Sequence, residues 1–175
     1  ADECVVRKLE LVMQQAGVTP DICPAVAASL EKAEATGKPA GAMVLPDGSV
    51  VTGRTSPLLG ASAALLLNAL KHMAGIDHKL DLIPPSVIEP ISAMKTGCLG
   101  HRNPRLHSDE VLIALAISGL TNPLAAMVQA QLKNLRGCEA HFSVIISEED
   151  AKLYKRLGIN VSCEAKYEVK SLYHK

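Results

Sequence analysis

Residues 138–163 read CEAHFSVIIS, EEDAKLYKRLG and INVSC, and this stretch decides the fold. Its first block is apolar and contains a run of β-branched residues, which predicts a strand. Ser147 is a favoured N-cap, the three acidic residues after it suit the first turn of a helix, and Gly158 ends that helix. The last block predicts a second strand. Two strands joined by one helix pair in parallel through a right-handed crossover, so the stretch predicts a parallel β-α-β unit.

A hairpin earlier in the chain adds an antiparallel pair. Residues 40–45 and 49–53 flank Pro46-Asp47-Gly48, and the Asp-Gly step adopts the positive φ that a tight hairpin turn needs. A further short strand is predicted over 80–83. Apolar residues at helical spacing predict helices over 3–16, 21–36, 58–74, 86–96, 109–120 and 123–135. The predicted fold class is therefore α/β, a mixed sheet with a hairpin and a parallel β-α-β unit, with helices on its faces and additional helices.

The change from helical to strand period divides the chain near residue 37. Residues 1–37 form an N-terminal helical segment, and residues 38–175 form a mixed α/β domain. Within that domain, Pro84-Pro85 and Arg136-Gly137 bound a helical insertion over about 84–136. The chain begins without Met, on a predicted helix, so we expect it to be part of a longer polypeptide.

Composition and charge exclude several classes of function. Hydrophobic residues make up 48% of the chain and aromatic residues only 2%, so the core must be aliphatic. Basic and acidic residues number 18 each, and this zero net charge argues against nucleic acid or a charged membrane surface as a partner. The same neutrality permits self-association into a homo-oligomer. No run approaches the roughly 18 apolar residues that a membrane helix needs.

The cysteines indicate the compartment. Their number is odd and they are scattered along the chain, which fits reduced thiols better than a disulfide framework. We therefore expect a cytoplasmic protein. The five residues are Cys4, Cys23, Cys98, Cys138 and Cys163.

Five stretches carry a resemblance to a known family. They are LPDG at 45–48, LGASAALLLNAL at 59–70, NPRLH at 103–107, LRGCEAH at 135–141 and LYHK at 172–175. In this order they resemble the C-terminal part of a bacterial family, domain of unknown function 1846, also called uncharacterised protein family 0371. The resemblance implies longer relatives whose N-terminal portion carries a Gly-rich, phosphate-loop-like stretch. That missing portion of the same polypeptide is thus an expected partner. The resemblance also implies a subdomain shaped like the cytidine deaminases.

The motif of a zinc deaminase is nevertheless missing. Such an enzyme needs a His or Cys two residues before a Glu at one helix start, and Pro-Cys-x-x-Cys at another. The corresponding helix start at 59–62 offers neither ligand nor acid, and Pro-Cys-x-x-Cys does not occur. Two Cys-x-x-His spacings exist, Cys98–His101 and Cys138–His141. In a strand the second pair would point to opposite faces. We therefore predict no metal and no cofactor, and a zinc hydrolase is disfavoured.

The predicted strand at 138–147 carries two polar side chains on one face. Glu139 and His141 are two positions apart, so they lie on the same face of the strand and can meet a ligand together. A His beside a carboxylate can act as a general base, which makes both residues catalytic candidates. The alternative is a polar strand face whose side chains are solvated.

A second candidate is an anion site at the start of the predicted helix 109–120. Guanidinium groups, an imidazole and free helix N–H groups together suit a small phosphate-bearing ligand. The alternative is a solvent-facing loop that ends in a well-formed cap at Ser108. The residues of this candidate site are Arg102, Arg105, His107 and Ser108.

The start of another predicted helix extends this candidate. Gly60 and Ser62 are small enough for a phosphate to approach the backbone, although close helix packing explains them equally well.

Two functions follow from these patterns. The first is a ligand-binding or catalytic C-terminal part of a larger protein that uses nucleotides or phosphate. The second is a structural or oligomerisation module without chemistry of its own. Convergence of Arg105, His107, Glu139 and His141 in one pocket would favour the first, and their scatter over the surface would favour the second.

Overall fold

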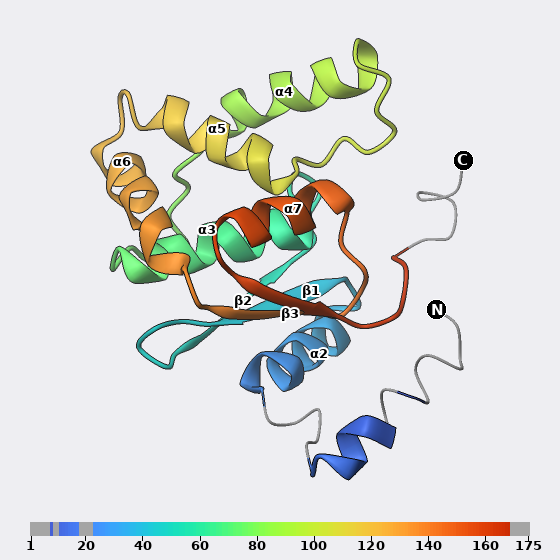
Figure 1. The fold of residues 1–175 in the computed structure, drawn as a ribbon. Helices are drawn as coiled ribbons and strands as arrows, with labels where there is room; N and C mark the ends of the chain where they lie inside the picture. Colours follow the sequence, from blue (N-terminus) through green and yellow to red (C-terminus); the bar gives the residue numbers. More distant parts are fainter. Residues whose placement is uncertain (1–7, 9–10, 18–22, 169–175) are drawn as a thin grey trace.

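The computed structural model describes residues 8, 11–17 and 23–168, with the arrangement shown in Figure 1. Residues 8 and 11–15 are helical and belong to the helix predicted over 3–16, the rest of which lies outside the described residues. The elements that follow are α2 (Pro24–Thr36), β1 (Ala40–Val44), β2 (Val50–Arg54), α3 (Ala61–Met73), α4 (Pro85–Gly97), α5 (Ser108–Ser118), α6 (Pro123–Gln129), the 3-10 helix η2 (Ala130–Leu135), β3 (Glu139–Phe142), α7 (Glu148–Arg156) and β4 (Asn160–Cys163).

The four strands form one mixed sheet in the order β2-β1-β3-β4. β1 pairs antiparallel with both β2 and β3, whereas β3 and β4 are parallel. The hairpin turn closes with a hydrogen bond from the Gly48 N–H to the Leu45 carbonyl at 2.9 Å, and Gly48 has a φ of 82°. The predicted α/β class, the hairpin and the parallel β-α-β unit are confirmed.

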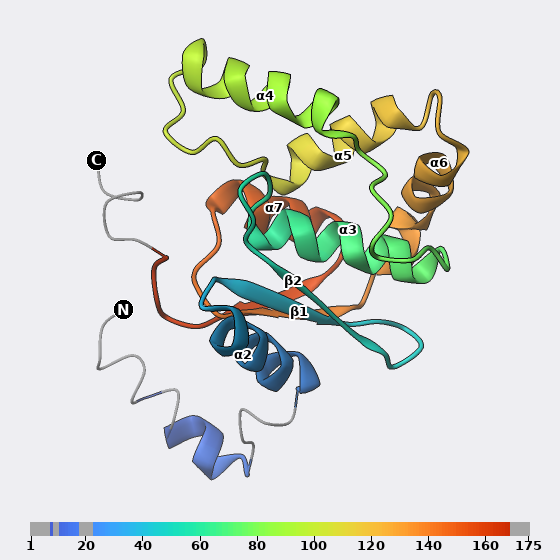
Figure 2. The same ribbon diagram turned by 180° about the vertical axis from the view of Figure 1, so that it is seen from behind.

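Helices cover both faces of this sheet. Figures 1 and 2 show α2 on one side and α3 with α7 on the other. The contact between α3 and β2 is so close that a Cβ added to Gly53 would lie 2.2 Å from the backbone N of Leu65. Phe142 of β3 and Tyr154 of α7 meet edge to face under these helices, with ring centroids 5.6 Å apart. The core around them is aliphatic, as the composition predicted.

Two predicted strands differ from the structure. The first, expected to reach residue 147, ends at Phe142. Phe142 pairs with Gly41 of the antiparallel strand β1, and β1 begins at Ala40, so β1 offers almost no partner for the residues after Phe142. The strand predicted over 80–83 is wrong, since the segment makes bends and buries Leu82. The Leu80 carbonyl is used locally, because it accepts from the ammonium of Lys71 at 2.5 Å. The same ammonium donates to the carbonyl of His78, just before the segment, at 3.1 Å.

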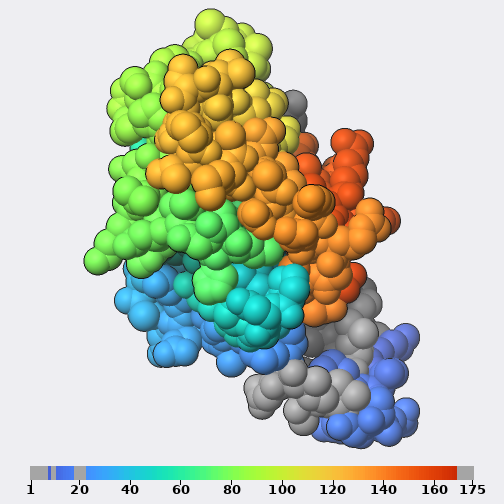
Figure 3. All heavy atoms as spheres, turned by 90° about the vertical axis from the view of Figure 1, so that its left-hand side faces the viewer, coloured from blue at the N-terminus to red at the C-terminus, as the bar shows by residue number. Residues whose placement is uncertain are grey.

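The helices α4, α5 and α6 lie beyond α3 and α7, on the side away from the strands. In the space-filling view of Figure 3 they form the upper part of the molecule, above the strands. They fall within the helical insertion predicted over about 84–136. Within the described ranges, no helix combines the length and the apolar character needed to cross a bilayer.

Candidate functional site

The first turns of α3, α5 and α7 meet at one place. The segments before α3 and α5 run side by side and form a parallel bridge between Leu59 and Leu106. Leu106 donates its N–H to the Leu58 carbonyl at 2.9 Å and accepts from the Gly60 N–H at 3.3 Å. These bonds fix the two helix starts relative to each other.

The carboxylate of Asp150, in the first turn of α7, joins the three helices. Its Oδ1 accepts hydrogen bonds from the N–H of Ser108 at 2.8 Å and from the Ser108 hydroxyl at 2.6 Å. Its Oδ2 accepts from the Ser62 hydroxyl at 2.7 Å. Asp150 is only 6% exposed. Burial alone would raise the pKa of Asp150, but the nearby His107 and the hydrogen bonds from Ser108 and Ser62 outweigh burial and hold that pKa well below its usual range.

His107 lies at the mouth of this network. Its Nδ1 is 3.6 Å from Asp150 Oδ2, the separation of an ion pair rather than of a hydrogen bond, and 3.5 Å from the Ser147 hydroxyl. The Asp150 carboxylate raises the pKa of His107, although burial acts in the opposite direction. The N-cap of α5 is His107 and not Ser108 as predicted, because the Ser108 hydroxyl is directed to Asp150.

Arg105 lies on the loop before α5 and is paired with a carboxylate. Its Nη1 is 2.8 Å from Glu168 Oε1, and the two side chains are 30% and 20% exposed. The Arg105 carbonyl accepts a hydrogen bond from the ammonium of Lys95 at 2.7 Å. Lys95 is buried and also donates to Glu110 at 2.6 Å, so the backbone of this loop is held firmly to α4 and α5.

A small cavity opens where these groups meet. Its volume is about 40 Å³, which suits a phosphate or carboxylate group and not a whole nucleotide. Four residues of the predicted anion site contribute to its wall, together with Thr55, Asn103, Ser147, Asp150 and Glu168. The four are Gly60, Ser62, Arg105 and His107.

The remaining predicted site residues lie elsewhere or are already occupied. Arg102 is exposed on the loop and does not line the cavity. Both donors of Ser108 are used by Asp150. Glu139 is exposed and accepts a hydrogen bond from the Asn160 amide at 2.7 Å.

His141 is buried on the opposite face of the sheet from the core under α3 and α7. Phe142 belongs to that core, and neighbouring residues of a strand point to opposite faces. The Nδ1 of His141 lies 2.7 Å from the Ser162 hydroxyl, and its Nε2 lies 3.3 Å from Glu164 Oε1. Burial lowers the pKa of His141, and Glu164 only partly offsets this. The structure therefore does not bring Glu139 and His141 to the cavity of Arg105 and His107.

Asp150 is the central residue that sequence reasoning missed. The sequence did show an acid three residues after the N-cap Ser147, and the Ser147 hydroxyl indeed accepts from the Asp150 N–H at 3.1 Å. This signal predicts only a helix start. The approach of Ser62 and Ser108, which are 88 and 42 residues away in sequence, depends on tertiary packing.

The cysteines and histidines considered as metal ligands are apart. Cys98 is exposed at the end of α4, and Cys138 is buried in the core. Among the residues that the structure describes, no three His, Cys, Asp or Glu side chains are grouped as metal ligands would be.

The residues that form the cavity and the sheet all lie in the part of the chain that matches one known sequence family. Residues 21–173 match the family model described as domain of unknown function DUF1846, C-terminal. The chain belongs to the DUF1846 family. The predicted resemblance to the C-terminal part of this family is thereby confirmed.

Curated relatives of this DUF1846 domain are longer proteins. A UPF0371 protein of Corynebacterium efficiens is 49% identical over 174 residues, which cover 99% of this chain and 35% of the relative. A UPF0371 protein of Corynebacterium glutamicum is 48% identical with the same coverage. A UPF0371 protein of Streptococcus pyogenes serotype M5 is 46% identical over 173 residues, again 35% of its length. The chain thus spans about a third of the length of the curated relatives it matches.

Proposed function

We propose that this DUF1846 domain binds the anionic end of a small phosphate-bearing ligand in the cavity at the start of α3. The observation that carries the proposal is the first turn of α3. Its N-cap is Gly60, and no side chain among the described residues caps this turn. Gly60 and Ser62 line the cavity together with the guanidinium of Arg105 and the imidazole of His107. Uncapped helix N–H groups and a guanidinium both favour an anion.

The start of α5 is a poorer candidate, although the sequence favoured it. Asp150 already supplies a carboxylate to the N–H and the hydroxyl of Ser108. A phosphate at this position would have to displace a buried, fully hydrogen-bonded group. At the start of α3, Asp150 accepts only from the Ser62 side chain, at 2.7 Å, and among the described residues no side chain accepts from the backbone N–H groups of this turn. This difference moves the proposed anion position from α5 to α3.

Arg105 is available to a ligand because its present partner is weakly held. The Arg105–Glu168 pair is partly exposed, and ion pairs in contact with water contribute little. A phosphate dianion can therefore compete with the single charge of Glu168. In the free protein Glu168 would occupy the place of the ligand.

His107 gives the site a means of proton transfer. Its Nδ1 faces Asp150, which leaves Nε2 as the nitrogen for a ligand. Because Asp150 raises its pKa, His107 can donate a proton near neutral pH. The proposed role is thus ligand binding, with acid–base chemistry at His107, within a larger protein that uses nucleotides or phosphate. The cavity holds one anionic group, so the remainder of a nucleotide would contact other parts of that protein.

The experiment that tests the proposal is a calorimetric titration of the full-length protein with inorganic phosphate and with nucleoside phosphates. Arg105→Ala should weaken binding about tenfold or more, since a charge-assisted contact contributes about 1.5–3 kcal/mol. Arg102→Ala is the matched control, because it removes the same charge from the same loop outside the cavity. Equal binding by wild type and Arg105→Ala, or an equal loss in both variants, would refute the site.

The second candidate function is a structural module. The bonds from Ser62 and Ser108 to Asp150 favour it, because they join three helices without any ligand. This function is the better one if no phosphate compound binds. For either function we propose the cytoplasm as the compartment, supported by the free thiols of Cys23, Cys98, Cys138 and Cys163.

A further inference from the structure

After its acidic first turn, helix α5 is apolar around its whole circumference over residues 111–117. Its inner side buries Val111, Ala114 and Leu115 in the core. Its other side exposes Ile113 by 58% and Ile117 by 51%. A helix that is hydrophobic on all sides is normally buried on all sides. One side of α5 therefore lacks the cover that its sequence requires.

The exposed apolar surface continues into the next helix. Leu120, between the two helices, is 83% exposed, and α6 adds Leu124 and Met127. α5 and α6 abut at Gly119, where a Cβ would lie 3.4 Å from the backbone N of Ala126. An apolar patch of this kind marks an interaction surface. We call it the outer face, and its residues are Ile113, Ile117, Leu120, Leu124 and Met127.

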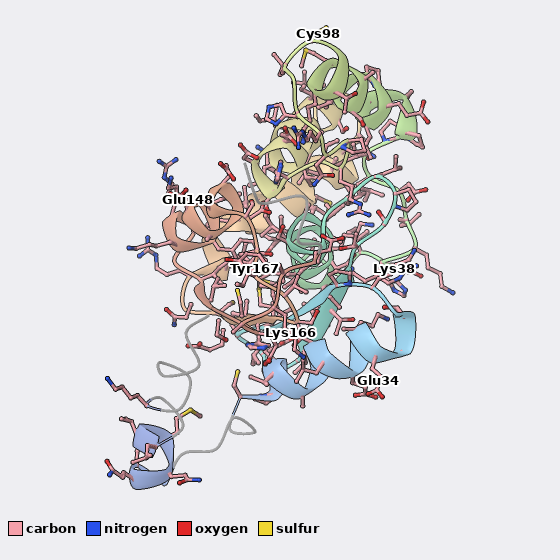
Figure 4. The ribbon with its side chains drawn as sticks, turned by 90° about the vertical axis from the view of Figure 1, so that its right-hand side faces the viewer. Glu34, Lys38, Cys98, Glu148, Lys166 and Tyr167 are labelled. Carbon is pink, nitrogen blue, oxygen red and sulfur yellow. The ribbon has the colours of Figure 1, made fainter. Side chains whose placement is uncertain are left out.

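Helix α4 gives a second, independent indication that this end of the molecule has a partner. Of its 13 residues only Ile88 and Lys95 are buried, and its further apolar packing is limited to the partly buried Val87 and Ile91. Polar bonds hold it to the loop beside it, from Lys95 to Glu110 and from the Ser92 hydroxyl to the Pro104 carbonyl. A helix of this length is marginal in water without apolar packing. Figure 4 shows Cys98, just after α4, at the opposite end of the molecule from Glu34 of α2.

We propose that the outer face is the docking surface for the N-terminal region of the same polypeptide. The family model matched here is a C-terminal one, and the relatives carry about two-thirds of their length outside the matched part. A region of the same chain is present at a fixed ratio and a high effective concentration. A second copy would leave five large apolar side chains open to water whenever the protein is dilute. The proposal does not depend on the anion site.

The neutral character of the outer face agrees with this partner. Its five residues carry no charge, so electrostatic attraction to a nucleic acid or an acidic peptide has no basis there. Permanent interfaces are more apolar than transient ones and resemble a protein core, with large apolar side chains at their centre. We therefore expect the N-terminal region to present a complementary aliphatic surface to α5 and α6.

The test uses the full-length protein with single cysteines at equally exposed positions. Ile117→Cys lies on the outer face, and Leu80→Cys is the matched control, since Leu80 is 48% exposed on the loop after α3. Maleimide labelling of each position is followed by peptide mass spectrometry, at concentrations where sedimentation shows a monomer. We expect Ile117→Cys to react at least about tenfold more slowly than Leu80→Cys, because only local opening of the docked surface exposes it.

Two results would overturn the proposal. Equal labelling rates at the two positions would mean that the outer face is open in the full-length monomer. Slow labelling of Ile117→Cys that appears only at concentrations where dimers form would assign the face to a second copy. Hydrogen exchange of peptides from α5 and α6 in the unmodified protein gives the same comparison without substitutions, should a variant fail to fold.

Discussion

At the scale of single residues, Asp150 is the group on which the most depends. One buried carboxylate accepts from the first turn of α5 and from the Ser62 hydroxyl, while its own backbone N–H completes the cap of α7. A charged acceptor with several donors is favourable, whereas the same donors without it are left unpaired in the interior. Asp150 is therefore both a structural group and the partner that sets the charge of His107.

Asp150→Asn should lower the free energy of unfolding at pH 7 by about 2–4 kcal/mol, because buried donors lose a charged acceptor. The folded-state pKa of Asp150 lies below its ordinary value of 3.8. The stabilisation is thus fully present above that value and is lost as the pH falls toward the lowered pKa. Urea denaturation at a series of pH values should show the difference between wild type and variant closing in acid.

Glu149→Gln is the control for this change. It removes one negative charge from the same turn of α7 at an exposed position, so its effect should stay within about 0.5 kcal/mol. In Asp150→Asn the pKa of His107, followed by NMR, should also fall, because Asp150 is what raises it. An equal loss of stability in both variants would contradict the account of Asp150.

A change at Glu168 should affect phosphate binding in the opposite direction to Arg105→Ala. If Glu168 occupies the place of the ligand, Glu168→Ala frees Arg105 and phosphate should bind about two- to fivefold more tightly, the range expected for a partly exposed ion pair. Glu164→Ala, which removes a charge beside His141 instead, should leave binding unchanged. The measurement is the same calorimetric titration. Weaker binding by Glu168→Ala would show that Arg105 is not a ligand.

At the scale of elements, the approach of α3 to β2 positions the start of α3 at the cavity. Gly53 allows it, because any side chain there would enter the backbone of α3 at Leu65. The helix thereby lies close to the hairpin, and its first turn reaches the bridge between Leu59 and Leu106. The small residues that the sequence shows at 60–64 thus serve both packing and access to the backbone.

Gly53→Ala should lower the free energy of unfolding by about 1–3 kcal/mol, as overpacking does when backbone has to move. The control is Gly97→Ala at the end of α4, where an added Cβ meets nothing within 4 Å. There the helix propensity of Ala should give a gain of up to about 1 kcal/mol. Thermal and urea denaturation of both variants measure the difference, and a loss of similar size in Gly97→Ala would contradict this explanation.

At the scale of the whole molecule, the cavity lies where helices from distant parts of the sequence meet. α3 and α7 form the layer over one face of the sheet, whereas α5 lies beyond them and bears part of the outer face. If the N-terminal region docks on α5, as proposed above, it also comes close to the proposed anion site without having to line it.

The sequence by itself determined the elements that local interactions govern. Asp47-Gly48 specifies the hairpin turn, Ser147 the start of α7, and Gly158 its end, because each acts within a few residues of backbone. The parallel pairing of β3 and β4 follows from the length of one connecting helix. Four cavity residues were also within reach, since Arg105 with His107 and Gly60 with Ser62 each lie at one predicted helix start.

Only the tertiary structure decided which distant groups meet. Ser62, Ser108 and Asp150 converge because α3, α5 and α7 pack together, and no local pattern encodes a separation of 88 residues. Glu139 and His141 were grouped correctly on one strand face, but the sheet turns that face away from the core that holds Phe142. Burial and pairing depend on the partner that packs against an element, and that partner is chosen by the assembled core.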